Sequence, residues 1–338
     1  MSKLERLWKC GRYLTDPAGT HVALKNGSAY FTGVQTCGSI WACPVCSARI
    51  RQRRALEIER ACLAHLSAGC SIGFGTMTLP HTRSDDLGDL LPVVQAAWKR
   101  VQQTGNFRSA MKRLQITGRI RSTEVTFGSW HGWHPHLHLL FFSDLLLSPD
   151  DWSAFRLILS DAWAAAVVRL GRPRPGDEVG VTLAPVYRAE VGQYLAKVQD
   201  HYGEASTVGR EMARGDVKKG RKRSRTPFEL AEAAVQGVMP ELPLWWSYEA
   251  ATKGRRAIEW SRGLKARYGV DEVEDEDLAA ADVDGDRVAW VDGPCWGLLV
   301  KAGQETHLLD LVEQGGQPAA HEFLTRLQTE AAAHKVED

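Results

Sequence analysis

The nine residues His134-Pro135-His136-Leu137-His138-Leu139-Leu140-Phe141-Phe142 carry the strongest structural signal in this chain. Polar and apolar residues alternate as far as His138 and an apolar run follows, which is typical of a strand that becomes fully buried. Because a strand directs every second side chain to the same face, His136 and His138 share a face while Leu137 enters the core. Two imidazoles side by side are suited to bind a divalent metal ion.

The rest of the chain mixes strands and helices. A second alternating segment, 120–127, is followed by a short loop, which predicts a hairpin with the histidine strand. Further strands are expected at 71–79 and 179–183, and a hairpin at 21–33 around Asn26-Gly27. Helices are expected at 47–66, 87–103, 149–170 and 188–199 and in pieces over 227–268. After an acidic linker at 271–286, strands at 287–291 and 295–300 and a helix from 318 to 334 predict a small module.

The composition is that of an ordinary globular protein, with 338 residues, 44% of them hydrophobic and 25% charged. Nowhere does the sequence approach the roughly 20 consecutive apolar residues of a membrane span. The N-terminus, Met-Ser-Lys-Leu-Glu-Arg, lacks the apolar centre of a signal peptide. We therefore expect a cytoplasmic protein with no membrane partner.

The net charge of +1 conceals a division along the chain. From residue 271 onward there are 17 acidic and 4 basic residues, whereas the first 270 hold 38 basic and 24 acidic ones. The segment 209–225 alone carries eight bases against two acids. A basic body favours a polyanionic partner. The alternative is an average protein with a solubilising acidic tail.

Four of the seven cysteines fall in the first 46 residues. Cys43 and Cys46 form a C-x-x-C knuckle, and with Cys37 and Cys10 they predict a structural zinc site. His21 is an alternative to Cys10 as the fourth ligand. A redox-active pair is the competing interpretation, but the thioredoxin-like unit that would hold it is missing. The other cysteines are expected to be core residues; they are Cys62, Cys70 and Cys295.

The histidine pair needs a third ligand to hold a metal. Glu124 on the preceding strand is the obvious donor, and the loop is compatible with a pairing of Glu124 with His138. Two imidazoles and one carboxylate with open positions suit a Mg²⁺ or Mn²⁺ that accepts phosphate oxygens. The alternative is a pair of histidines satisfied by ordinary hydrogen bonds. The H-E-x-x-H helix of many zinc hydrolases is absent.

A third candidate lies in the expected helix 188–199. Glu190, Tyr194 and Lys197 are spaced four and three residues apart and would project from one face. A phenol becomes an effective nucleophile when a cation stabilises the phenolate and the scissile phosphate is held in line with it. A carboxylate one turn away could activate water for a second step. The alternative is an amphipathic helix with a half-buried tyrosine.

Together these motifs resemble the HUH endonucleases, and most closely the rolling-circle replication initiators of actinobacterial plasmids. The matching segments are the cysteine motif at 36–46, Gly132-Trp133-His134-Pro135-His136-Leu137-His138, and the Y-x-x-K of Tyr194 and Lys197, in the family's order. The resemblance covers roughly residues 1–265. It implies an α+β fold with a central antiparallel sheet flanked by helices, an N-terminal zinc-binding element and a histidine pair on a central strand; the small C-terminal module lies outside the motifs.

The resemblance also implies an activity. Enzymes of this family nick one strand at a plasmid origin, their tyrosine becomes linked to the 5′ phosphate, and the freed 3′ hydroxyl primes synthesis with host helicase and replication proteins. Tyr194 matches the nucleophile and Glu190 the glutamate that directs hydrolysis at termination, while Lys197 would offset developing charge. Tyr187 and Tyr202 lie nearby and are rival nucleophiles. Arginines on the outer face of the 47–66 helix and in the 209–225 segment would hold the DNA backbone; on the helix they are Arg49, Arg51, Arg53 and Arg54.

The predicted organisation has four parts. They are a zinc element at 1–48, a nickase domain at 49–207, a basic and helical DNA-binding extension at 208–270, and an acidic linker with a small module at 271–338. A zinc-containing DNA-binding regulator without catalysis is the alternative from another class. Within the enzymes, a conjugative relaxase or a single-strand transposase fits less well, because relaxases usually place the tyrosine before the histidine motif.

Overall fold

The computed structural model describes residues 2–25, 27–187, 224–238, 240–281 and 285–334. The chain divides into two compact units. The larger unit comprises residues 40–273, and the smaller unit comprises 2–39 together with 274–338. Each unit has its own sheet.

The larger unit contains a six-stranded sheet with the order β6-β3-β5-β4-β7, and β8 also pairs with β4. All of its pairings are antiparallel. Its strands are β3 (Ser71–Thr78), β4 (Ile116–Gly128), β5 (Gly132–Ser143), β6 (Val181–Val186), β7 (Ser224–Arg225) and β8 (Ile258–Trp260). Its helices are α2 (Pro44–Ser67), α3 (Leu87–Val101), α4 (Gly105–Arg113), α5 (Pro149–Arg169), α8 (Pro227–Val235), α9 (Glu241–Thr252) and α10 (Leu264–Arg267).

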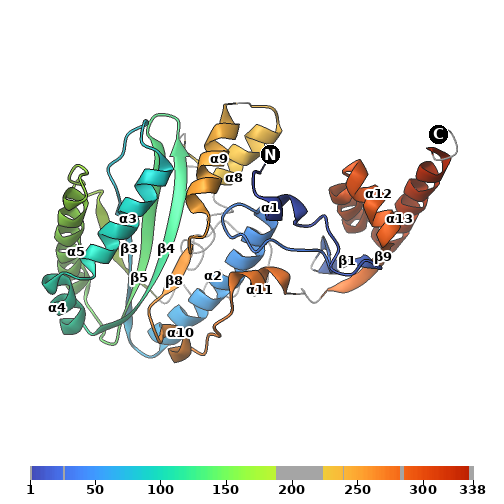
Figure 1. Ribbon diagram of the computed structural model, residues 1–338. Coiled ribbons are helices and arrows are strands. Elements are labelled where there is room, and N and C mark those ends of the chain that lie inside the picture. The colour runs from blue at the N-terminus through green and yellow to red at the C-terminus, as the bar shows by residue number, and fades with distance from the viewer. Residues whose placement is uncertain (1, 26, 188–223, 239, 282–284, 335–338) are drawn as a thin grey trace. The chain divides into compact units, whose positions relative to one another are not determined.

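The histidine strand β5 lies at the centre of this sheet, between β3 and β4. Leu140 and Phe142 pack on one face in a cluster with Ile58 of α2. Phe141 points to the other face and contacts Trp98 of α3 and Phe155 of α5. Figure 1 shows the sheet running between α3 and α5 on one side and α2 on the other. Because helices cover both faces, the end of β5 must be apolar at every position, which explains the run of four hydrophobic residues.

Local sequence determines several helix ends. Ser148 caps α5 by accepting a hydrogen bond from the backbone N–H of Asp151, and the Asp151 carboxylate in turn accepts one from the Ser148 N–H. Thr226 and Glu229 form the same reciprocal box at the start of α8. At the start of α2, the Cys43 sulfur accepts from the Cys46 N–H. These helices therefore begin at fixed positions relative to the strands they cover.

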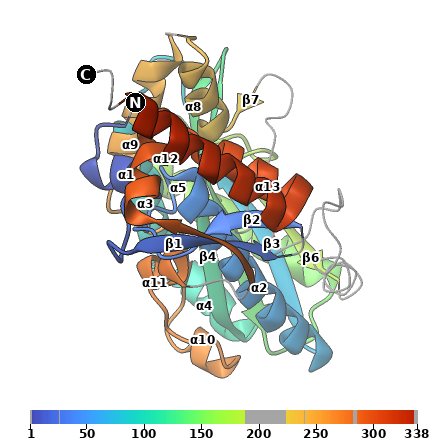
Figure 2. The same cartoon turned by 90° about the vertical axis from the view of Figure 1, so that its right-hand side faces the viewer.

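The smaller unit holds the three-stranded antiparallel sheet β2-β1-β9. Its elements are α1 (Glu5–Lys9), β1 (Gly19–Lys25), β2 (Ser28–Phe31), α11 (Asp275–Ala280), β9 (Asp286–Asp292), α12 (Gly293–Ala302) and α13 (Glu305–His334). Figure 2 shows α12 and α13 lying over this sheet. Val22, Val291 and Leu299 belong to its buried core. The long helix α13 is broken at Gly316, whose φ of 62° lies outside the helical region.

Most expected elements are confirmed. The hairpin of β4 and β5 is longer than predicted, and the 21–33 hairpin, the helices at 47–66, 87–103 and 149–170 and the strands at 71–79 and 287–291 are present with small shifts of their ends. Two expectations were wrong. Residues 295–300 form part of helix α12, because Asp292 caps its N-terminus by accepting from the Cys295 N–H. The segment predicted as an acidic linker contains α11, whose first turn gathers acidic residues that favour a helix N-terminus.

The prediction of an outward-facing arginine row on α2 was also wrong at two positions. Arg51 and Arg54 are only 6% and 7% exposed. The Arg51 Nε donates to Ser47 Oγ at 3.1 Å, and Arg54 pairs with the Glu57 carboxylate at 3.0 Å. Both guanidinium groups are therefore held inside the protein, because hydrogen-bond partners within the larger unit compensate for their burial.

Some expectations fall outside the described residues. These are the helix at 188–199 with Glu190, Tyr194 and Lys197, and most of the basic segment 209–225. Within the part of the chain that the structure describes, none of the helices combines the length and apolar character needed to cross a lipid bilayer.

Candidate functional site

Glu124 of β4 and His136 and His138 of β5 meet on one face of the central sheet. Their ligand atoms all lie within 4.8 Å of one another. The Glu124 Oε2 atom is 2.9 Å from the His138 Nε2 and 3.5 Å from the His136 Nε2. The structure thus brings together the three side chains that the sequence predicts as ligands of a divalent ion.

The register differs from the expectation in one respect. Glu124 lies opposite His136, and Ser122 is the residue opposite His138. The contact of Glu124 with His138 is therefore diagonal rather than direct. It is possible because a carboxylate on two methylenes reaches a diagonal neighbour on the same face of an antiparallel pair.

Neighbouring groups orient both imidazole rings. The His136 Nδ1 lies 3.3 Å from the His134 carbonyl, so its N–H donates there and the Nε2 lone pair faces the carboxylate. The His138 Nδ1 lies 3.1 Å from the Thr76 hydroxyl of β3, and its ring stacks on Phe74 with centroids 5.4 Å apart. Metal-binding histidines characteristically use one ring nitrogen for the ion and the other for such an outer partner.

This donor set fits a divalent cation. Both histidines turn Nε2 toward the same carboxylate oxygen, and their Nδ1 atoms are engaged elsewhere. Two nitrogens and one carboxylate on one face leave room for exchangeable ligands such as water or phosphate oxygens, as Mg²⁺ and Mn²⁺ require. Metal binding here stays a prediction, now with a geometry that supports it.

A cavity of about 1060 Å³ lies beside the cluster. Thr78, Thr126 and His134 line it and stand on the same sheet face as Glu124, since Thr78 pairs with His136 and Thr126 with His134. The tip of the β4–β5 hairpin contributes Trp130, whose side chain is 67% exposed. The three predicted ligands themselves do not line the cavity, but their neighbours on the same sheet face do.

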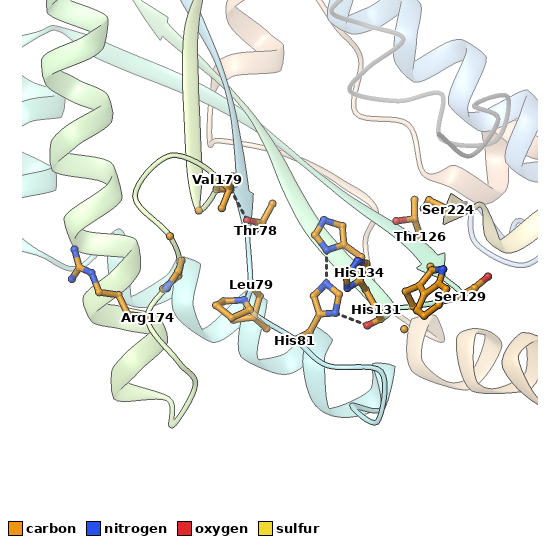
Figure 3. A pocket seen from close by; sticks show the side chains of 17 residues that line it. Thr78, Leu79, His81, Thr126, Ser129, His131, His134, Arg174, Val179 and Ser224 are labelled. Carbon is orange, nitrogen blue, oxygen red and sulfur yellow. Dashed lines mark hydrogen bonds between the residues drawn. The ribbon is translucent and has the colours of Figure 1, made fainter. Parts of the chain in front are cut away.

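Figure 3 shows a second histidine pair at this cavity, with His81 and His134 pointing toward each other. The His81 Nε2 is 2.6 Å from the His134 Nδ1, and the His81 Nδ1 donates to the His131 carbonyl at 2.9 Å. Burial, reinforced by the neighbouring imidazoles of His136 and His81, lowers the pKa of His134 to about 3. Burial likewise lowers the pKa of His81. Both rings are therefore neutral at pH 7 and serve as hydrogen-bonding groups of the cavity wall.

The four cysteines predicted as zinc ligands are divided between the two units. Cys43 and Cys46 stand at the start of α2 in the larger unit, where the Cys43 sulfur accepts a hydrogen bond from the Cys46 N–H. Cys10 and Cys37 belong to the smaller unit, as does the alternative ligand His21, whose ring packs edge-on against Trp290. The zinc site and its fourth ligand therefore stay predictions.

The sequence did not single out three residues of this site. Thr76 is recognisable only through its pairing with His138, which depends on the order of strands in the sheet. His81 lies three residues after the end of β3 at Thr78, and Trp130 lies in the hairpin loop. An exposed aromatic residue in a loop beside a metal motif is the one signal that could have identified Trp130.

The chain is similar in sequence to two known proteins of Streptomyces. The chain is 31% identical to the protein named "Protein rep" of Streptomyces lividans. The alignment is 340 positions long and covers 80% of this chain and 73% of that protein. It is also 33% identical over 138 residues to a "Neomycin resistance protein" of Streptomyces cyanogenus, a match that covers 34% of this chain and 32% of that protein. No protein-family model and no solved structure matches the chain. The extent of the first match shows that this protein belongs to the family of the Streptomyces lividans Rep protein.

Proposed function

We propose that this protein initiates plasmid replication by the rolling-circle mode, nicking one DNA strand at the origin and transferring it to Tyr194. The observation that carries this proposal is the convergence of Glu124, His136 and His138 beside a large cavity, in a chain that belongs to a Rep family. The spacing of the two histidines and the order of the motifs support the same conclusion.

Glu124, His136 and His138 would hold Mg²⁺ or Mn²⁺ at the cavity. A bound ion of this kind supplies Lewis acidity that polarises a scissile phosphate. Thr76 and the His134 carbonyl fix the two imidazole rings, so that the Nε2 atoms stay directed at one point. The protein's part in this is to position the phosphate before any bond breaks.

Tyr194 would then attack the phosphate. Its phenolic oxygen forms a bond to phosphorus, the bond from phosphorus to the 3′ oxygen breaks, the phenolic proton leaves to solvent, and the 3′ oxygen takes up a proton. The 5′ phosphate ends on the tyrosine and the free 3′ hydroxyl is available to host replication proteins, a helicase among them. Lys197 would offset the charge on the phosphate in the transition state.

Chain length allows Tyr194 to reach the cluster. The described chain extends to Tyr187, seven residues earlier, and seven residues can span at most about 25 Å. Strand β6 ends beside Ile72, six residues along β3 from Thr78, the partner of His136, which corresponds to about 20 Å. The connecting segment is thus long enough to return to the cavity.

The cavity wall suits a single strand. Trp130 offers an exposed aromatic face on which an unpaired base can stack, a contact worth about 1–3 kcal/mol per base in other proteins. The neutral His134 ring, whose Nδ1 contacts His81, can hydrogen-bond through its Nε2 to base edges or sugar oxygens without adding charge. The substrate would therefore be the unpaired strand of an extruded or supercoiled origin.

The experiment incubates the protein and Mn²⁺ with single-stranded oligonucleotides that have a randomised centre and a 3′ label. Covalent transfer leaves the labelled downstream fragment on the protein, where denaturing electrophoresis detects it and sequencing identifies the cut site. We expect the adduct with the native protein and none with Tyr194→Phe. Glu190→Ala should form the adduct at the native rate but release it slowly, since this carboxylate would activate water in the second step.

Tyr187→Phe and Tyr202→Phe are matched controls, because each removes one nearby phenolic hydroxyl from a rival nucleophile. Both should retain full adduct formation. An adduct that persists in Tyr194→Phe but disappears in a control would move the nucleophile. DNA binding without any adduct in either Mg²⁺ or Mn²⁺ would instead favour a regulator without catalysis.

A further inference from the structure

A group of basic side chains lies on the face of the central sheet opposite to the face that carries Glu124, His136 and His138. Two cavities of about 550 and 450 Å³ share Lys99, Gln102 and Arg119 in their walls, so they adjoin and are treated together as one groove. Helices α3 and α4, strands β4 and β8 and the segment before β8 supply its lining.

Strand geometry separates this groove from the metal cluster. Arg119 and Arg121 of β4 lie opposite Phe141 and Leu139, whereas Glu124 lies opposite His136. Side chains at odd and even positions of β4 project to opposite faces, so the two arginines point away from the side that carries Glu124. The groove is therefore a separate surface and does not belong to the cavity of Figure 3.

The groove is strongly positive. Its walls contain one acidic residue, Glu259, which pairs with Arg121. They contain six bases, which are Lys99, Arg108, Arg119, Arg121, Arg255 and Arg256. This imbalance leaves a concentrated positive potential, which attracts polyanions over distances of about 8 Å at physiological salt.

Two of these bases, Arg255 and Arg119, are oriented by hydrogen bonds to neutral groups, which do not cancel the positive charge of the guanidinium. The Arg255 Nη1 donates to the Gln95 amide oxygen at 2.6 Å and its Nε to the Ala251 carbonyl at 2.7 Å. Arg119 donates to the Gln102 amide oxygen. The pKa of Arg119 is lowered by burial and by the adjacent charge of Arg121. Neutral partners fix the guanidinium groups in place while their charge remains available to a ligand.

The groove also has more donors than acceptors. Arg121 is 8% exposed, and its Nε has no hydrogen-bond partner among the described residues. The same holds for the indole N–H of Trp260, which also lines the groove. An anion with several oxygens would balance this excess of N–H groups.

We propose that this groove binds the sugar–phosphate backbone of the DNA duplex that flanks the nick site. The inference rests on the proposed function for the identity of the polyanion. Six bases distributed over two adjoining cavities match a chain of phosphates better than one compact anion. The single strand would then enter the metal side of the sheet while the duplex is held from the other side.

The test neutralises three exposed bases that line the groove, Lys99, Arg108 and Arg256. Their combined change to Gln should weaken binding of a mixed-sequence duplex by about 10- to 100-fold at 0.1 M salt. The slope of log affinity against log salt should fall by about 0.9 for each phosphate that the variant no longer neutralises. Fluorescence anisotropy measures both quantities, and circular dichroism checks that the variant is folded.

The matched control changes three exposed bases outside the groove, Arg100, Arg113 and Arg262, to Gln. It removes the same charge and should leave the duplex affinity within about 2-fold, since none of the three lines the groove. Equal losses in both variants, or none in the groove variant, would overturn the proposal. So would unchanged duplex binding together with lost binding of a fluorescent ATP analogue, which would make the groove a nucleotide site.

Adduct formation on a short single strand separates this proposal from the proposed function. The groove variant should form the adduct at the native rate, because the groove lies on the face opposite Glu124. If the native protein forms no adduct, the proposed function fails, while the duplex measurement still decides the role of the groove.

Discussion

Two clusters of histidine and carboxylate side chains lie in the larger unit, and both bring their ligand atoms within 4.8 Å of one another. The first is Glu124, His136 and His138, whose neighbours Thr78, Thr126 and His134 line the cavity of Figure 3. The second is His65, Cys70 and Asp144, near the other end of β5. They differ in what the ring nitrogens and carboxylate oxygens already contact.

In the second cluster, hydrogen bonds engage the ligand atoms. The His65 Nε2–H donates to the Ser143 carbonyl at 2.8 Å, and the Tyr268 hydroxyl donates to the His65 Nδ1 at 2.7 Å. Arg267 pairs with the Asp144 carboxylate at 2.7 Å and contacts the Tyr268 ring. These contacts join α2 and α10 to the end of β5, so this cluster is a structural network.

The first cluster is arranged differently, because the Nδ1 of each histidine contacts an outer partner while Nε2 is directed at the carboxylate that both rings share. A short distance between His, Cys, Asp and Glu side chains is therefore not enough to identify a metal site. The use of the second ring nitrogen distinguishes the two cases.

Metal content gives the largest expected effect. The protein should hold one Zn²⁺ at the cysteine cluster and bind one Mn²⁺ at Glu124, and the His65 cluster should hold none. Cys43→Ser should lose the zinc and destabilise the fold by several kcal/mol, given that structural zinc sites in small peptides contribute about 10–16 kcal/mol. Mass spectrometry of the metal content and thermal denaturation measure this. A third equivalent of metal that Asp144→Asn removes would contradict the comparison.

Ligand replacement gives the next largest effect. Glu124→Gln and His138→Ala should each reduce Mn²⁺ affinity and the rate of adduct formation by more than about 100-fold, which exceeds the 10- to 100-fold cost of losing an outer partner. Asp144→Asn is the matched control and should stay within about 3-fold on both measures. Calorimetric Mn²⁺ titration and the oligonucleotide assay report the two quantities.

Substitution in the His65 cluster should lower the stability of the fold and leave the metal affinity unchanged. His65→Ala should reduce the free energy of unfolding by about 2–3 kcal/mol, because it leaves the buried Ser143 carbonyl and the Tyr268 hydroxyl without partners. Its Mn²⁺ affinity should match that of the native protein. Urea denaturation followed by tryptophan fluorescence measures the change, and Tyr268→Phe, which loses one hydrogen bond, should cost less. A neutral His65→Ala would refute the structural role.

Thr76→Val tests the outer partner of His138. It removes the hydroxyl but keeps the branched shape, and Mn²⁺ affinity should fall by about 10-fold as the His138 ring loses its fixed orientation. Thr76→Ser restores a hydroxyl and should recover most of the affinity. Equal affinities for the two variants would show that the hydroxyl does not orient the ring.

The smallest effect concerns pH. Burial lowers the pKa of His65 below its usual value of 6.5, so the unfolded chain binds a proton there more readily than the folded protein does. The free energy of unfolding should therefore decrease as the pH falls below about 6.5. His65→Gln, with no titratable ring, should show a flatter pH dependence between pH 7 and 5. Urea denaturation at a series of pH values compares the slopes, and identical slopes would contradict the assignment.

The sequence predicted most elements near the site, because their signals are local. Alternation identified β4 and β5, and the predicted helix at 149–170 corresponds to α5, whose N-cap is Ser148. It failed at residues 295–300, where a six-residue apolar run fits a strand as well as a helix and the Asp292 cap decides. It also misjudged Arg51 and Arg54, since their burial depends on partners that helical periodicity does not reveal.

For the candidate site, the sequence by itself determined that His136 and His138 share a face, because strand geometry is fixed by the covalent backbone. It also determined that Cys43 and Cys46 are close, since a C-x-x-C turn is short. Only the tertiary structure decided that Glu124 lies opposite His136, that Thr76 orients His138, and that the bases of the groove gather on the far face. Those relations depend on strand order, register and helix packing, which join residues distant along the chain and leave no periodic signal in it.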